Sequence, residues 1–103
     1  MTTPPAAGAD LIADTIAAAV RACPAVAGLH GGRYGEVATY LPGHAVVGVR
    51  VTDRDVGVHV VGRYPASIAA IAEQVRTAVG TVVADRPVSV TVEDLAVPES
   101  RQP

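Results

Sequence analysis

A histidine, a carboxylate and an arginine that could form a small charged site fall on alternating, strand-like segments of this chain. His59, Glu93 and Arg50 would meet if those segments were neighbouring strands. A histidine beside a carboxylate is the minimum for general acid–base catalysis. Because glycines surround these residues, we expect a shallow solvated face, and surface electrostatics is the favoured interpretation. An enzyme or small-ligand protein that uses His59 and Glu93 is the alternative.

The other histidines and the single cysteine do not form a recognisable site. His30, His44 and His59 lack the close spacing of metal ligands, and one cysteine supplies no zinc pair. We therefore expect separate surface histidines, no metal and no cofactor. Cys23 would be a nucleophile only with a histidine against it. At the end of an Ala-rich helix, a small buried apolar residue is the favoured interpretation.

The segment Val26 to Gly43, VAGLHGGRYGEVATYLPG, contains glycines spaced as G-x-x-G-G-x-x-G. A phosphate-binding loop needs a helix N-terminus directly after its glycines. Here Glu36 and a strand-like run follow, and the chain has no lysine. We therefore predict a hairpin turn between two short strands, in which glycines permit positive φ. Arg33 and Tyr34 at its tip form a candidate interaction loop.

Nucleic-acid binding is disfavoured by charge. The chain has eight basic and ten acidic residues and a formal net charge of -2, the opposite of an extended phosphate-binding surface. Arg33-Tyr34 and Arg63-Tyr64 are faintly similar to the alternating basic and aromatic residues of single-strand binders. The favoured interpretation is that the tyrosines, Tyr40 included, line the rim of the core with wet hydroxyls. A weak RNA-binding module is the third alternative.

Hydrophobic periodicity predicts the elements that position these residues. Helical spacing predicts one helix over residues 9–22, ended by Pro24, and another over residues 66–84. Alternation and turn residues predict strands at 25–30 and 36–41, a Pro42-Gly43 turn, a β-hairpin in AVVGVRVTDRDVGVHVV around residues 52–55, and a last strand in PVSVTVEDLAVP.

The element order α-β-β-β-β-α-β predicts an α+β fold with an antiparallel or mixed sheet of about five strands and both helices packed on its valine face. Val47, Val49 and Val51 are expected on that face. The opposite face is expected to be polar and either solvated or in contact with a protein. The residues of this candidate interaction face are Arg50, His59, Thr91 and Glu93.

The rest of the organisation is simple. We expect one domain over residues 9–98, between disordered tails at 1–8 and 99–103. No secretory pattern opens the sequence, and no apolar run approaches the roughly 18–20 residues that span a bilayer. The expected location is therefore cytoplasmic, without direct membrane insertion.

Four segments, taken in order, resemble the alkaline shock protein family of bacterial envelope-stress proteins. CPAVAGLHGG resembles the exit from the family's first helix, and VVGVRVTDRDVGVHVVGRYP its central hairpin. IAEQVRTAV, with Gln74-Val75, resembles its second helix, and VSVTVEDLAVP its final strand. Ala25 and Pro65 stand where glycine is usual in the family. The segment EVATYLPG resembles a short actinobacterial subgroup.

The resemblance implies a small non-enzymatic α/β domain without catalytic residues. Family members are abundant cytoplasmic proteins that self-associate and gather at the inner face of the membrane through a membrane-anchored partner. The resemblance thus implies a homo-oligomer that contacts such a partner or related family members, in a response to envelope or alkaline stress.

Overall fold

The computed structural model describes the backbone of residues 7–97 and the side chains of residues 12–97. Its elements are α1 (Ala7–Arg21), β1 (Val26–Leu29), β2 (Ala38–Leu41), β3 (His44–Val47), β4 (Val49–Val51), β5 (Val56–Arg63), α2 (Ile68–Gly80) and β6 (Val88–Ala96). The α+β class is confirmed. Residues 7 and 8, predicted as tail, are helical, and residues 1–6 and 98–103 lie outside the described part.

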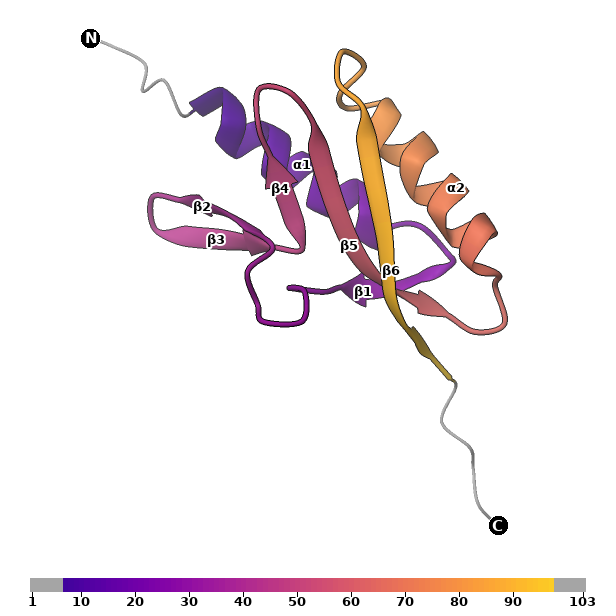
Figure 1. Ribbon diagram of the computed structural model, residues 1–103. Helices are drawn as coiled ribbons and strands as arrows, with labels where there is room; N and C mark the ends of the chain where they lie inside the picture. The colour runs from indigo at the N-terminus through magenta and orange to yellow at the C-terminus, as the bar shows by residue number, and fades with distance from the viewer. Residues whose placement is uncertain (1–6, 98–103) are drawn as a thin grey trace, which may run out of the picture.

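Strand β5 is the centre of the main sheet (Figure 1). Strand β6 runs parallel to β5 along residues 56–63, which makes the sheet mixed. The antiparallel strands β4 and β1 pair with residues 56–58 and 60–62 of β5. They meet end to end at His59, whose N–H donates to Gly48 O at 2.9 Å and whose C=O accepts from His30 N at 2.8 Å. Strands β4 and β1 therefore share the edge of β5 opposite β6.

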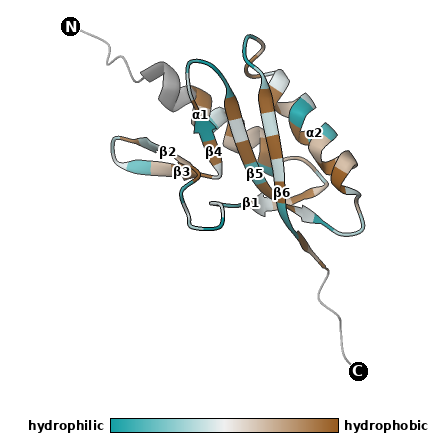
Figure 2. Cartoon of the chain, viewed as in Figure 1, coloured by the Kyte–Doolittle hydropathy of each residue, from teal (hydrophilic) through white to brown (hydrophobic). Residues whose placement is uncertain are grey.

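The hydrophobic core lies between the helices and the valine face of the sheet. Val56, Val58 and Val60 of β5 are fully buried, and residues of both helices belong to the same core cluster. Figure 2 shows the resulting alternation of apolar and polar bands along β5 and β6. The residues of the helices in the cluster recur at three- and four-residue steps, as the periodicity predicts: Ala13, Ile16, Ala17, Val20, Ile71, Val75 and Val79.

The second helix is shorter than predicted. It begins after Ser67, whose Oγ accepts a hydrogen bond from Ala70 N at 3.0 Å. It ends at Gly80, because Thr81 closes the last turn with its N–H and its hydroxyl on Ala78 O. Ile68 therefore lies in the first turn and is 59% exposed. Within residues 7–97, no helix is long and apolar enough to cross a membrane.

The predicted hairpin strand before residues 52–55 is broken at Gly48 into β3 and β4, so the described part has six strands, divided between a four-stranded and a two-stranded sheet. Gly48 has φ of +87°, a conformation that turns the chain between β3 and β4. The break reverses the alternation: Val46 is buried, whereas Val47, predicted on the core face with Val49, is 49% exposed. Because valines flank Gly48 on both sides, the alternation of apolar residues continued through this position and did not indicate the break.

The predicted pairing of the segments 25–30 and 36–41 is wrong. Strand β1 pairs with β5, and β2 instead forms a separate two-stranded sheet with β3 around the Pro42-Gly43 turn. Residues 30–37 are therefore a connection between two sheets and not a hairpin turn. Figure 1 shows the β2–β3 hairpin beside the main sheet, at the end away from α2.

Candidate functional site

The polar face of the main sheet carries a histidine–carboxylate pair. His59 lies on β5, and Glu93 lies on the parallel neighbour β6. The register shifts after the pairs His59–Thr91 and Val60–Val92, so that Val61 pairs with Asp94 and Glu93 is the additional residue of a β-bulge. This bulge directs Glu93 Oε2 to His59 Nδ1, at 2.5 Å.

This pair is partly shielded from solvent. The side chains of His59 and Glu93 are 25% and 22% exposed. A hydrogen bond this short, in a partly desolvated position, is stronger than the same pair in water. It fixes the imidazole ring and leaves Nε2 as the nitrogen that could exchange a proton with a bound molecule. Of the four residues predicted for the interaction face, these two are brought into contact.

The other two residues of the predicted interaction face have separate roles. Thr91 lies opposite His59 in the register and is exposed. Arg50, on β4, has a different partner: its Nη2 donates to Glu36 O at 2.8 Å. Of the possible cluster of His59, Glu93 and Arg50, the side-chain contact between His59 and Glu93 is present, and the Arg50 guanidinium is held by the carbonyl of the neighbouring connection.

The glycine-rich connection closes on itself. Three of its N–H groups donate within the connection: Gly32 N to His30 Nδ1, Tyr34 N to Glu36 Oε1, and Gly35 N to Gly32 O. A phosphate-binding loop must leave such donors free for the anion. Here a carboxylate already occupies one of them, so the loop geometry serves the chain's own turn.

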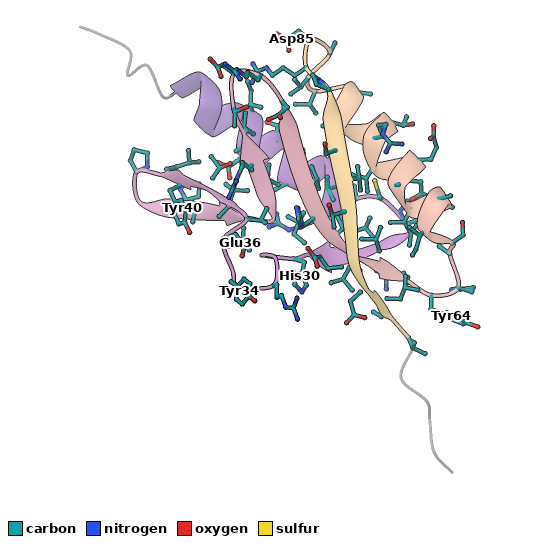
Figure 3. All side chains as sticks on the ribbon, viewed as in Figure 1. His30, Tyr34, Glu36, Tyr40, Tyr64 and Asp85 are labelled. Atoms are coloured by element: carbon teal, nitrogen blue, oxygen red, sulfur yellow. The ribbon has the colours of Figure 1, made fainter. Side chains whose placement is uncertain are left out.

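Arg33 and Tyr34 lie at the tip of this connection. The Arg33 guanidinium carbon is 5.9 Å from the centre of the Tyr34 ring, within cation–π distance. The Tyr34 side chain is 83% exposed. Figure 3 shows Tyr34 on the connection and Tyr40 on the neighbouring hairpin, both directed outward.

The remaining histidines are separate from each other, as the spacing predicts. His30 is engaged with the Gly32 N–H, and His44 contacts Asp14 of α1 through Nε2 at 3.2 Å. Among the described residues, no group of three or more histidine, cysteine, aspartate or glutamate side chains is placed to hold a metal ion.

A groove between the two helices was not predicted from the sequence. It has a volume of about 590 Å³ and lies away from His59 and Glu93. Small side chains leave the space, and the side chain of Gln74 in its lining is held by its Oε1, which accepts a hydrogen bond from Ala25 N at 3.0 Å. Its lining includes Ala19, Ala22, Cys23, Ala70, Gln74 and Ala78. Alanines at helical spacing on both helices were the available signal.

Cys23 is a buried apolar residue within this groove wall. Its Sγ lies 3.5 Å from Ala19 O and 3.7 Å from Gln74 O, so its polar neighbours are backbone carbonyls. Burial raises the pKa of the Cys23 thiol above its ordinary value. The thiol is therefore held in its neutral, unreactive form.

No family model, curated protein or solved structure matches this chain.

Proposed function

We propose that this chain is a non-catalytic protein of envelope or alkaline stress that acts through self-association and protein–protein contacts. The basis is the resemblance of its segments to the alkaline shock protein family, combined with one structural observation. That observation is an apolar surface on the β2–β3 hairpin that the fold leaves open.

This outer hairpin surface consists of Tyr40, Ala45 and Val47. The pairs Tyr40–Ala45 and Ala38–Val47 place these side chains on one side of the hairpin. Tyr40 is 74% exposed, Val47 is 49% exposed and Ala45 is exposed as well. The other side, with Thr39 and the buried Val46, faces the body of the protein. Exposed aromatic and aliphatic side chains that cluster on a projecting element are typical of contact surfaces.

The proposed location follows from the same role. We place the chain in the cytoplasm, at the inner face of the membrane when a membrane-anchored partner holds it. The outer hairpin surface and the tip residues Arg33 and Tyr34 are the part that would meet this partner.

Partner capture from native cell extract tests the proposal. Wild-type bait and a Tyr40→Ser/Val47→Ser bait are compared, with light scattering after size exclusion as the measure of self-association. We expect the double variant to lose most of the captured partner, because the substitutions remove the apolar contact area. Tyr64→Ser is the matched control, since Tyr64 is 53% exposed but lies outside this surface. A strictly monomeric wild type at high concentration that captures nothing would overturn the proposal.

A second candidate function is acid–base or ligand-binding chemistry at His59 and Glu93. The 2.5 Å contact between their side chains favours it. The test is a small-molecule library screened by thermal shift, with His59→Gln as the comparison. A ligand that stabilises the wild type but not the variant would support this candidate over the first.

Two of the arginines that an RNA-binding surface would use are engaged within the chain. Arg50 donates to Glu36 O, and Arg63 donates to the carbonyls of Pro24 and Val26. These two guanidinium groups are thus engaged by the chain's own backbone carbonyls.

A further inference from the structure

The two edges of the main sheet differ in whether their outward backbone groups have hydrogen-bond partners. At β4, the hydroxyl of Thr39 donates to Val49 O at 2.6 Å and accepts from Val51 N at 3.2 Å, so the outer edge is occupied. At the opposite edge lies β6, a strand of nine residues. Within residues 7–97, β5 is the only strand with which β6 pairs.

The hydrogen-bond phase of β5 and β6 shows which groups of β6 face outward. Val56 N donates to Pro87 O at 3.0 Å. In a parallel ladder the bonding residues of one strand alternate, so Ser89 and Thr91 direct their N–H and C=O groups toward β5. Val88, Val90 and Val92 therefore direct theirs away from the sheet, as a row of open donors and acceptors.

The side chains of this edge are also incompletely covered. Val56, Val58 and Val60 of β5 are fully buried, whereas the neighbouring Val88, Val90 and Val92 are only partly buried. Soluble proteins protect such edges with charges, prolines or bulges. Residues 88–92 contain none of these, since the bulge and the acidic pair Glu93-Asp94 come only afterwards.

We propose that β6 pairs with β6 of a second copy of this chain, antiparallel, with the two-fold axis at Val90. In this register Val90 faces Val90 of the second copy and Val88 faces Val92. All of these residues have outward N–H and C=O groups, so each pair exchanges both of its hydrogen bonds. The result is one continuous sheet in which the partly buried valines of the two copies cover each other.

Charge selects this antiparallel arrangement. It places the acidic end of one β6, at Asp94, beside Arg86 at the start of the other. A parallel pairing would instead put Glu93 and Asp94 of both copies side by side, which is unfavourable for like charges on neighbouring strands. Within its own chain Arg86 contacts Asp85 Oδ1 at 3.4 Å and donates to Thr52 O at 2.8 Å, so the antiparallel arrangement is favoured because it keeps the acidic ends of the two strands apart.

The inference rests on the self-association in the proposed function and names the surface that carries it. Sedimentation equilibrium of three chains tests it: wild type, Val90→Pro and Val90→Ala. Proline removes the outward N–H of Val90 without removing a donor to β5, a position that edge strands tolerate. We expect it to weaken the dimer by at least about tenfold. Val90→Ala keeps that N–H and controls for the lost side chain, so it should weaken the dimer less.

Disulfide trapping tests the register without depending on stability. In a Cys23→Ala background, Ser89→Cys chains are mixed with Thr91→Cys chains. The proposed register makes Ser89 and Thr91 of the second copy a non-hydrogen-bonded pair with Cα atoms about 4.5 Å apart, within disulfide range. Mixed chains should therefore cross-link faster than either variant alone, in which the cysteines are diagonal neighbours.

The outcomes separate this inference from the proposed function. A dimer that is unaffected by Val90→Pro and gives no preferential mixed cross-link overturns the β6 pairing but leaves self-association through another surface. A wild-type monomer that still captures a partner protein through the outer hairpin surface also overturns the pairing and leaves the contact role. A monomer that captures nothing overturns both.

Discussion

Thr39 and Val49 are joined by a hydrogen bond of 2.6 Å from the Thr39 hydroxyl to the Val49 carbonyl, across the gap between the two sheets. The same hydroxyl accepts from Val51 N, so one side chain satisfies two of the backbone groups at the outer edge of β4. It also attaches the β2–β3 hairpin, with its outer surface, to the body of the protein. The Thr39 side chain thus provides hydrogen bonds to the edge of β4 that a neighbouring strand would otherwise provide.

Replacing Thr39 should show how much this attachment contributes. Thr39→Val keeps the shape of the side chain but leaves the backbone groups of Val49 and Val51 without their partner. We expect the free energy of unfolding to fall by about 1–3 kcal/mol. Thr39→Ser keeps the hydroxyl and should cost less. Urea denaturation measures both, and equal losses for the two variants would argue against the role of the hydroxyl.

Two glycines that are alike in the sequence should respond oppositely to alanine. Gly48 has φ of +87°, and a Cβ there would lie 2.8 Å from Leu29 Cβ and 3.0 Å from His30 N. Gly48→Ala should therefore destabilise the protein by more than about 1 kcal/mol. Gly80 ends α2, and its Cβ would meet nothing within 4 Å.

Gly80→Ala should accordingly stabilise the protein by about 0.5–1 kcal/mol, since alanine loses less backbone freedom in a helix. Thermal unfolding of the two variants against the wild type is the measurement. A shift of the melting temperature in the same direction for both would show that the break at Gly48 is not required.

The His59–Glu93 pair should couple more strongly than the other histidine–carboxylate pair. Its side chains are about a quarter exposed, whereas His44 and Asp14 are 50% and 54% exposed. Double-mutant cycles with alanine should give a coupling energy of about 0.5–1.5 kcal/mol for the first pair. For the second, solvent screening should keep it within a few tenths. Equal couplings would mean that burial does not strengthen the His59–Glu93 contact.

The sequence predicted the parts of this fold that depend on local periodicity. The stripes of α1 and α2, the Pro42-Gly43 turn and the alternation of β5 follow from spacing alone. The partner of β1 did not, because pairing with β5 joins residues 31 to 36 positions apart in a chain whose segments are uniformly rich in valine. The break at Gly48 depends on the close approach of Leu29 and His30, which only the folded chain brings there.

The candidate site was predictable to the same extent. His59 and Glu93 share the polar face by alternation, and this placement is confirmed. The bulge that brings their atoms together has no signature in the sequence, and neither does the competition that turns Arg50 to the Glu36 carbonyl. The role of Thr39 was missed because a threonine in a strand normally indicates only β propensity.

The buried thiol of Cys23 gives a pH-dependent prediction. Burial raises its pKa above the ordinary value of 9.0, so the folded state favours the neutral thiol more than the unfolded state does. The stability that comes from this preference is complete below pH 9 and is lost as the pH rises through the higher folded pKa. The stability of the wild type should therefore fall more steeply above pH 9 than that of Cys23→Ala, a comparison in which other titrating groups cancel. Urea midpoints of both chains across this range measure the difference. At pH 8, Ellman's reagent should modify Cys23 far more slowly in the native protein than in urea, and rapid native modification would contradict the burial of the thiol.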